Sequence, residues 1–244
     1  MTRLTYEDYL KHLQGLARGD EHSGEIRLLT SKEEIEQARA EIKVRLRQRG
    51  EDESLAKIGV VYQDQYLIVF RDAVRFRTGN AGTYLRVTLP GGLQGDAGVV
   101  LIVTRAGQVL LKRSYRHATR RWELEFPRGF RAIGRSIEGA ALDELHEETG
   151  YRGSAEPVII GRFLPDSGLM PHTVTVVGVE VSGHPDAMNL EEMESIQSEE
   201  VWMTPTQITA STRDGTLRDG MTLAAWALYR SRQSGAGNND GRQW

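Results

Sequence analysis

The chain has 244 residues, enough for one large domain or for a core with an appendage, and its formal net charge is only -3. A charge this close to neutral favours neither nucleic acid nor an anionic membrane as a general partner. The absence of cysteine excludes disulfides, thiolate metal sites and a cysteine nucleophile. Because the chain starts without an apolar signal core and has no run long enough to span a membrane, we expect a soluble cytoplasmic protein.

The first 50 residues are predicted to be helical. Apolar side chains recur at helical spacing over residues 4–16, and Ser31 with Glu34 matches a capping box before a second apolar stripe. Gly50 and the acidic sequence EDES then mark a boundary. We therefore interpret residues 1–50 as a helical N-terminal extension, and the simplest role for it is to pack on a catalytic core.

From residue 58 the periodicity changes to that of strands. Short runs of β-branched and aromatic residues alternate with turn residues, which is typical of an antiparallel meander. Before the glycine-rich turn PGGLQGDAG, the predicted strands cover residues 58–62, 66–70, 74–77 and 83–89. After it, they cover residues 99–104 and 109–112. The glycines of this turn lack the strand-and-helix context of a phosphate loop, so we interpret residues 51–97 as an antiparallel strand region.

The segment at residues 129–151, GFRAIGRSIEGAALDELHEETGY, has the clearest pattern in the chain. In a helix, at about 100° per residue, Glu144, Glu147 and Glu148 share one face. Ser136 is a suitable N-cap for this helix. The neighbouring stripe is apolar and consists of Ala141, Leu142 and Leu145. Like charges at this spacing repel, so the carboxylates are either well solvated or hold hard cations, which prefer oxygen ligands.

The frame around these carboxylates resembles the box of the Nudix hydrolases. That box reads G, five residues, E, seven residues, R-E-U-x-E-E-x-G-U, where U is a bulky apolar residue. Gly129 opens the box here, the sequence ELHEETG that starts at Glu144 and ends at Gly150 matches its helix, and Tyr151 takes the last position. Gly150 also suits the left-handed residue that ends a helix. The resemblance implies that Gly129 and Gly150 support the site structurally.

Two positions depart from the family's box. Arg135 stands where the family has glutamate, and Asp143 stands where it has arginine. In the family these two side chains support the loop and the helix, and they carry opposite charges. The charges are exchanged here but remain opposite, so we hypothesise that Arg135 and Asp143 form a reversed ion pair that preserves the support. The alternative is a degenerate loop in a protein that binds without hydrolysing.

The sequence before the box resembles the ADP-ribose and nucleotide-sugar pyrophosphatase branch, in which a Y-R pair and an E-L-P-x-G segment precede the helix. Here Tyr115-Arg116 and WELEFPRG take these places. Arg116 is a candidate phosphate contact because a guanidinium matches two phosphate oxygens at once. Glu125 is a candidate metal or substrate ligand, and a surface ion pair is the alternative for each. The backbone carbonyl of Arg128 is a candidate to complete a metal shell.

The sequence after the box offers two further site candidates. Pro165 lies fifteen residues beyond Gly150, near a proline characteristic of the ADP-ribose branch, which favours a nucleoside diphosphate sugar as substrate. The acidic segment NLEEMESIQSEEVW follows, where the related pyrophosphatases have a glutamate that activates water or helps hold metal. A carboxylate on a mobile segment suits that role, and we choose Glu194, with Glu192 next. Strands are predicted at residues 158–164, 173–181 and 201–203.

The chain is predicted to close with a helix. The sequence TPTQI is interpreted as a short turn, Asp219 as a helix cap, and Leu223, Trp226 and Arg230 recur at helical spacing. Residues 232–244 are polar and glycine-rich, and we expect them to be a disordered tail.

Together these patterns predict an α/β fold. The resemblance implies a Nudix-type α/β/α sandwich with a mixed sheet, N-terminal antiparallel strands and a helical N-terminal extension, with the catalytic domain at residues 98–231. It also implies hydrolysis of the diphosphate linkage of ADP-ribose or a related nucleotide sugar to two monophosphates. Mg²⁺ or Mn²⁺ would be held by Glu144, Glu147 and Glu148. Members of the branch are often homodimers, and no nucleic acid or membrane partner is expected.

Two other interpretations stay open. In one, the altered box has lost hydrolysis and the protein senses a nucleotide; the intact Glu144, Glu147 and Glu148 argue against it. In the other, the substrate is a different diphosphate, such as a dinucleoside polyphosphate, a coenzyme or a capped RNA end. The near-neutral charge and the few interleaved aromatic residues disfavour RNA.

Overall fold

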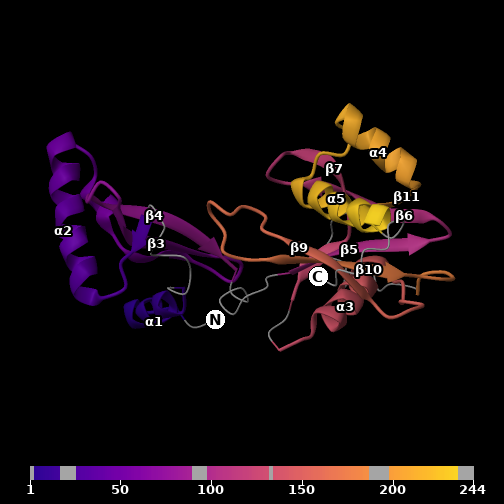
Figure 1. The fold of residues 1–244 in the computed structure, drawn as a ribbon, viewed down its shortest axis with the longest axis horizontal. Helices are drawn as coiled ribbons and strands as arrows, with labels where there is room; N and C mark the ends of the chain where they lie inside the picture. The colour runs from indigo at the N-terminus through magenta and orange to yellow at the C-terminus, as the bar shows by residue number, and fades with distance from the viewer. Residues whose placement is uncertain (1–2, 17–25, 90–97, 132–133, 187–197, 236–244) are drawn as a thin grey trace. The chain divides into compact units, whose positions relative to one another are not determined.

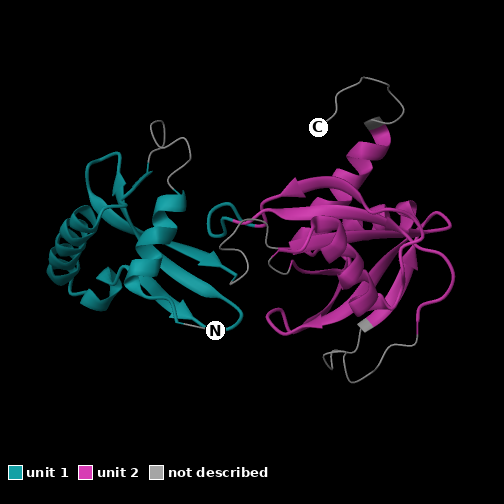
Figure 2. Ribbon diagram, turned by 90° about the horizontal axis from the view of Figure 1, so that it is seen from below, with its two compact units in different colours: residues 1–95, 166–171 teal, residues 96–165, 172–244 magenta. Residues whose placement is uncertain are grey.

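The computed structural model (Figure 1) describes residues 3–16, 26–89, 98–131, 134–186 and 198–235. Its contacts divide the chain into two compact units, shown in separate colours in Figure 2. Unit 1 comprises residues 1–95 and 166–171, and unit 2 comprises residues 96–165 and 172–244. No helix in the described ranges is long and apolar enough to cross a membrane.

Unit 1 is a small antiparallel sheet packed with two helices. Its elements are α1 (Tyr6–Leu16), β1 (Ile26–Leu28), α2 (Lys32–Arg49), the 3-10 helix η1 (Glu53–Ala56), β2 (Gly59–Gln63), β3 (Ile68–Phe76) and β4 (Ala81–Thr88). Strand β3 pairs with β1, β2 and β4. Tyr9 from α1, Ile35 from α2 and Phe70 from β3 belong to one buried core. The predicted boundary at residue 50 therefore falls inside this unit, because the helices and the strands bury their apolar faces together.

Strand β3 corrects two sequence predictions. Residues 66–70 and 74–77 were expected to be separate strands, but Ile68–Phe76 is continuous. The apparent break comes from two charged residues, Arg71 and Asp72. Asp72 is buried and accepts hydrogen bonds of 2.9 and 3.2 Å from Arg86 on the neighbouring strand, so a charged residue occupies a core position by pairing across the sheet.

Unit 2 is a mixed sheet between helices. Its elements are β5 (Gly98–Arg105), β6 (Gln108–Arg116), β7 (Arg121–Glu125), β8 (Arg128–Phe130), α3 (Ile137–Thr149), β9 (Val158–Phe163), β10 (Val174–Glu180), β11 (Ser198–Met203), α4 (Pro205–Asp214) and α5 (Gly220–Gly235). The strand order is β11-β6-β5-β10-β9, with β7 beside β6 and β8 beside β5. Within the described residues of this unit, β5 and β10 form the one parallel pair, and the other strand pairs are antiparallel.

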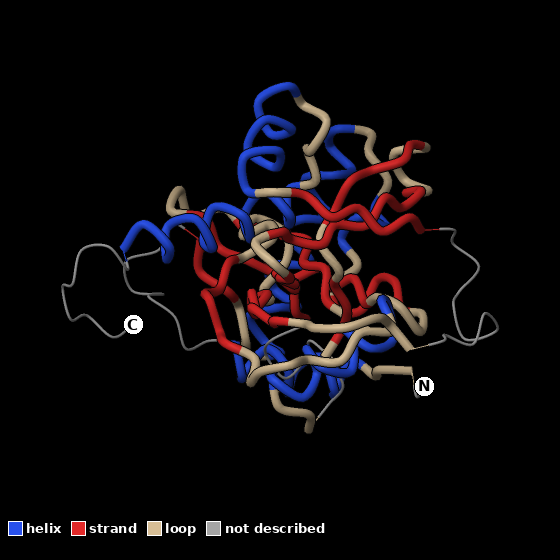
Figure 3. Tube along the Cα trace, turned by 90° about the vertical axis from the view of Figure 1, so that its right-hand side faces the viewer, coloured by secondary structure: helices blue, strands red, loops and turns tan. Residues whose placement is uncertain are grey.

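The alternation of β5 explains the layers. Val99, Leu101 and Val103 pack in the core on the side of α3, whereas Val100 and Ile102 pack in the core that includes Trp226 of α5. Figure 1 shows α3 on one face of this sheet and α4 and α5 on the other, and the helices and strands can be followed separately in Figure 3. The predicted α/β/α sandwich with a mixed sheet is confirmed.

Two predictions near the end of the chain were wrong. The sequence TPTQI does not form a short turn but starts α4, in which Thr204 and Gln207 form a reciprocal capping box and Pro205 takes the first turn. The predicted tail starts too early, because α5 continues to Gly235. Residues 236–244 lie outside the described ranges.

Candidate active site

Helix α3 forms as its capping residues predict. The Ser136 side chain accepts a 3.0 Å hydrogen bond from the Gly139 N–H, and Gly150 ends the helix in the left-handed region with φ of 71°. Ala141 and Leu145 are fully buried against the sheet. Leu142 was expected on the same stripe, but it is 38% exposed, so the apolar face is narrower than predicted. The carboxylates lie on the stripe of the helix beside this apolar face.

The glycine that opens the segment is required by a close contact with the helix. Strand β8 pairs with β5, with Gly129 opposite Val99. A Cβ atom on Gly129 would lie 1.9 Å from Cδ of Glu144, well inside van der Waals contact. Only glycine therefore lets the Glu144 carboxylate rest against this loop.

Glu144 is held where its charge is unfavourable. The pKa of Glu144 is raised to about 7. Burial is the largest cause, and the charges of Glu148, Glu147 and Asp143 contribute the rest. Lys112 opposes the shift only in part. Near neutral pH a large fraction of Glu144 is thus protonated when no cation is bound, because burial and the neighbouring carboxylates both disfavour its charge.

Glu148 has two partners from the sheet. Its Oε2 atom accepts a 3.3 Å hydrogen bond from the backbone N–H of Arg128 and lies 3.3 Å from Nζ of Lys112. The Lys112 ammonium also donates to the backbone carbonyl of Glu148, at 3.2 Å. Glu147, by contrast, is exposed on the helix. The helix therefore presents one carboxylate to the loop, one to the sheet and one to solvent.

The predicted ion pair between Arg135 and Asp143 is present. The Arg135 guanidinium donates two hydrogen bonds of 2.7 Å to the two oxygens of the Asp143 carboxylate. The pair joins the loop before the helix to its middle turn. Hydrogen bonding from Arg135 holds the pKa of Asp143 below its usual range, as expected for an ion pair with this geometry. Whether it maintains activity stays a prediction.

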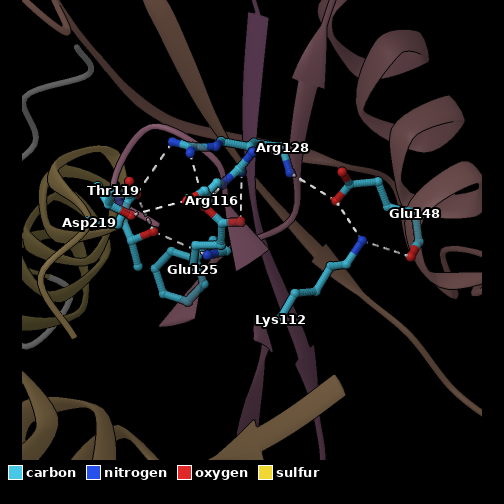
Figure 4. Close-up of polar contacts among 9 residues, drawn as sticks. Lys112, Arg116, Thr119, Glu125, Arg128, Glu148 and Asp219 are labelled. Carbon is cyan, nitrogen blue, oxygen red and sulfur yellow. Dashed lines mark hydrogen bonds and ion pairs between the residues drawn. The ribbon is translucent and has the colours of Figure 1, made fainter. Parts of the chain in front are cut away.

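A second charged cluster lies beside Glu148 (Figure 4). Glu125, only 2% exposed, accepts from both Arg116 and Arg128, with N–O distances of 2.6 and 2.9 Å. The other terminal nitrogen of Arg128 lies 3.4 Å from Asp219. Two arginines thus compensate one buried carboxylate, and breaking such a pair costs about 3 to 5 kcal/mol. Arg116 and Glu125 thus form an ion pair with a buried carboxylate, where the alternative considered was a surface pair, and their contacts with substrate or metal stay predictions.

An open cavity borders this cluster. Its volume is about 520 Å³, and its charged lining residues are Arg116, Arg121, Glu123, Arg218 and Asp219. Arg218 is fixed in place by two hydrogen bonds of 2.8 and 2.9 Å to the Glu123 carboxylate.

The comparison with family models decides the family. A model described as NUDIX domain matches residues 60–223. This chain belongs to the Nudix family.

Two similar proteins fit the branch that the sequence resembles. The chain is 36% identical over 119 residues to an ADP-sugar pyrophosphatase from Mus musculus, a match that covers 46% of this chain and 54% of that protein. The chain thus spans about half the length of this curated relative. A crystal structure of an ADP compounds hydrolase has the same fold, with a TM-score of 0.62 and 18% identity, and the match covers 74% of this chain and 94% of that one.

Several residues that the sequence predicted for the site lie away from the charged cluster of Glu125, Arg116 and Arg128, or outside the residues that the structure describes. Glu194 and Glu192 fall in residues 187–197, which are not described. Pro165 lies half-buried in the bend after β9, and its contact with substrate stays a prediction. Glu200, expected in a loop, is on β11 and is the cross-strand neighbour of Lys112, because β11 starts at Ser198.

The donor set of the Nudix helix suits a hard divalent cation, although it does not form a closed ligand group. Glu144 and Glu148 supply carboxylate oxygens, and the neighbouring carboxylates add to the burial that raises the pKa of Glu144. Among the described residues, no three acidic or histidine side chains converge as a metal centre. Mutual repulsion, the exposure of Glu147 and the contact of Glu148 with Lys112 account for the open arrangement.

Sequence reasoning missed Lys112 and the side chain of Arg128. A signal for Lys112 existed, because residues 112, 114 and 116 of β6 face the same side of the sheet. Lys112 therefore lies on the face that carries Arg116. The partners of the Arg128 guanidinium come from separate elements, and no spacing in the sequence indicates them.

Proposed function

We propose that the protein is a hydrolase that uses a divalent cation to cleave the diphosphate linkage of ADP-ribose or a related nucleotide sugar into two monophosphates. The observation that carries the proposal is the contact of Gly129 with Glu144, which places a partly neutralised carboxylate against the loop that opens the Nudix box. The names of the mouse relative and of the structural neighbour support an ADP-containing substrate.

In this proposal Glu144 and Glu148 hold the cation, with Glu147 as a third ligand or relay and the carbonyl of Arg128 completing the shell. Bound Mg²⁺ or Mn²⁺ neutralises charge on the phosphoryl oxygens and lowers the pKa of water. Glu194 accepts the proton as the oxygen of water bonds to phosphorus and the bridging P–O bond breaks.

The proposal gives the sheet residues separate tasks. Arg116 is 41% exposed, so its guanidinium can donate to a phosphate while the buried Glu125 fixes its orientation. Lys112 balances the charge of Glu148. A homodimer belongs to the proposal through the family resemblance alone, and light scattering measures it.

The test is release of AMP from ADP-ribose, with Mg²⁺ or with EDTA. We expect turnover only with the cation, and Glu148→Gln should lower kcat about a hundredfold or more, since it weakens transition-state charge stabilisation worth several kcal/mol. Glu138→Gln makes the same chemical change at an exposed position in the first turn of α3 and should keep wild-type activity.

One result would replace this function. If the wild type binds nucleotides but turns over neither ADP-ribose nor a panel of other diphosphates, the protein is a nucleotide sensor. The panel includes a dinucleoside polyphosphate, a coenzyme and a capped RNA, so turnover of one of these would instead change only the substrate.

A further inference from the structure

Arg128 contacts Glu148 through its backbone N–H and contacts Glu125 and Asp219 through its guanidinium. Its backbone N–H donates to Oε2 of Glu148, at 3.3 Å, while its guanidinium points away from the helix. Figure 4 shows the side chain reaching Glu125 and Asp219 on the side opposite Glu148. The residue therefore connects the carboxylate of α3 with the beginning of α5.

The far end of this connection is firmly held. Asp219 accepts from the N–H and the hydroxyl of Thr222, at 2.9 and 2.7 Å, and so caps α5. The buried Glu125 carboxylate is also oriented by Arg116, whose Nε donates at 3.0 Å. The Arg128 guanidinium thus lies between two carboxylates that are themselves fixed, which restricts the side chain and the backbone to which it belongs.

The near end needs such a restraint. Strand β8 has only three residues, and a pairing this short is weak by itself. The preceding loop is fastened by the Phe126 N–H to the Thr222 hydroxyl, at 3.1 Å, and by the Pro127 carbonyl to the Leu101 N–H, at 2.8 Å. The Pro127 carbonyl and the Arg128 N–H belong to one peptide unit, so the bond to Leu101 holds one side of the peptide that faces Glu148. The ion pairs of Arg128 add a restraint from its side chain.

We propose that Arg128 is a positioning residue, whose guanidinium, clamped between Glu125 and Asp219, holds its own backbone N–H on the Glu148 carboxylate. The inference rests on the proposed function, because it assigns Glu148 a cation to bind. Arg128 occupies the variable position of the E-L-P-x-G segment, so the clamp is a property of this chain's own sequence. Hydrogen bonds to a metal-binding carboxylate orient it and raise its affinity for the ion.

The first measurement is Mn²⁺ binding without substrate, followed by electron paramagnetic resonance of the free ion. Arg128→Met keeps an unbranched side chain close to the aliphatic part of arginine and keeps the backbone N–H, but it removes the clamp, and it should weaken Mn²⁺ binding about tenfold or more. Arg218→Met is the matched control, because Arg218 also makes a two-bond ion pair with a strand glutamate. Within the described residues, no hydrogen bond or ion pair joins Arg218 to Glu148. Arg218→Met should change binding less than about twofold.

A second variant, Asp219→Asn, and kinetics with ADP-ribose distinguish loss of the clamp from loss of the folded structure. Asp219→Asn keeps a good N-cap for α5 but removes one charge from the clamp, so it should fold and weaken Mn²⁺ binding in the same direction. Arg128→Lys, which offers a single ammonium in place of a planar fork, should recover only part of the affinity. With ADP-ribose, kcat of Asp219→Asn should fall while KM changes little, since this variant leaves the Glu125 pair with Arg116 intact.

The outcomes separate the two proposals. Wild-type Mn²⁺ affinity in folded Arg128→Met or Asp219→Asn would overturn the clamp alone, as would equal weakening by Arg218→Met. If the wild type binds no Mn²⁺ and hydrolyses no diphosphate, the proposed function fails and the clamp fails with it. If the wild type binds Mn²⁺ without hydrolysis, the function fails, and the variants still decide the clamp.

Discussion

At the scale of single residues, the site depends on the lack of a side chain at residue 129. Gly129 could be read from the sequence as the residue that opens the box, but the reason for glycine is spatial. The missing Cβ is where the Glu144 carboxylate lies. Sequence pattern therefore predicts the identity of the residue, whereas the structure supplies the steric cause.

Gly129→Ala should consequently displace Glu144 without unfolding the protein. We expect kcat for ADP-ribose to fall about a hundredfold, because a shift of one ångström in a catalytic group costs about that much. Gly220→Ala is the control, since a Cβ there has no neighbour within 4 Å and it should retain activity. Steady-state kinetics with circular dichroism tests this, and an active Gly129→Ala would show that Glu144 need not occupy its observed position.

The raised pKa of Glu144 gives a prediction for stability in EDTA. The pKa of about 7 in the folded state exceeds the ordinary glutamate value of 4.5, so the folded state binds more protons between these values and the wild type loses stability as pH rises through this window. Glu144→Gln removes the charge and should stabilise the protein at pH 8 by on the order of 1 to 3 kcal/mol, but little at pH 4.5.

Urea unfolding at the two pH values measures this difference. Glu138→Gln, on the same helix, should have the same small effect at both. A Glu144→Gln effect that does not grow with pH would show that the carboxyl is not strained by burial and by its neighbours.

At the scale of elements, helix α3 was the most predictable part of the fold. Ser136 and Gly150 cap it as expected, because capping depends on local backbone groups and on few residues. Helix α4 was missed although Thr204 and Gln207 carry a start signal. Among the first residues that follow, only Ile208 is buried, so the apolar periodicity was too weak to indicate a helix.

The reversed pair between the loop and α3 predicts the result of a charge exchange. Arg135→Glu would place two carboxylates where a two-bond ion pair now exists, and we expect about a tenfold loss of activity. Adding Asp143→Arg should restore most of it, because opposite charges face each other again. Kinetics at several Mg²⁺ concentrations measures the recovery.

The matched control for this exchange is Arg152→Glu. Arg152 pairs with Asp186 at 2.8 Å and is exposed, so its reversal should leave activity unchanged. If the double variant at residues 135 and 143 stays as impaired as Arg135→Glu, the pair does not support the loop in the way we infer.

At the scale of the whole molecule, the local patterns predicted an α/β fold and the resemblance of the box predicted the sandwich, but neither predicted the pairing of distant charges. The box and the capping residues predicted the helix that carries Glu144 and Glu148, and the resemblance implied the layers around it. The contact of Arg128 with Asp219 joins residues 91 positions apart and closes only when β8 and α5 meet in the folded unit. A single sequence contains no spacing that encodes such a contact, so Arg128 was assigned only a backbone role.

The division of the chain has a consequence for anyone who shortens the gene. Residues 166–171 are flanked on both sides by unit 2 in sequence, yet they belong to unit 1, where the Leu169 carbonyl accepts from the Val87 N–H at 2.9 Å. A fragment that starts at residue 96 would keep this segment and lose its partner strand, and a fragment that stops at residue 95 would lose the segment. Neither fragment therefore contains a complete unit 1, and the proposed assays should use all 244 residues.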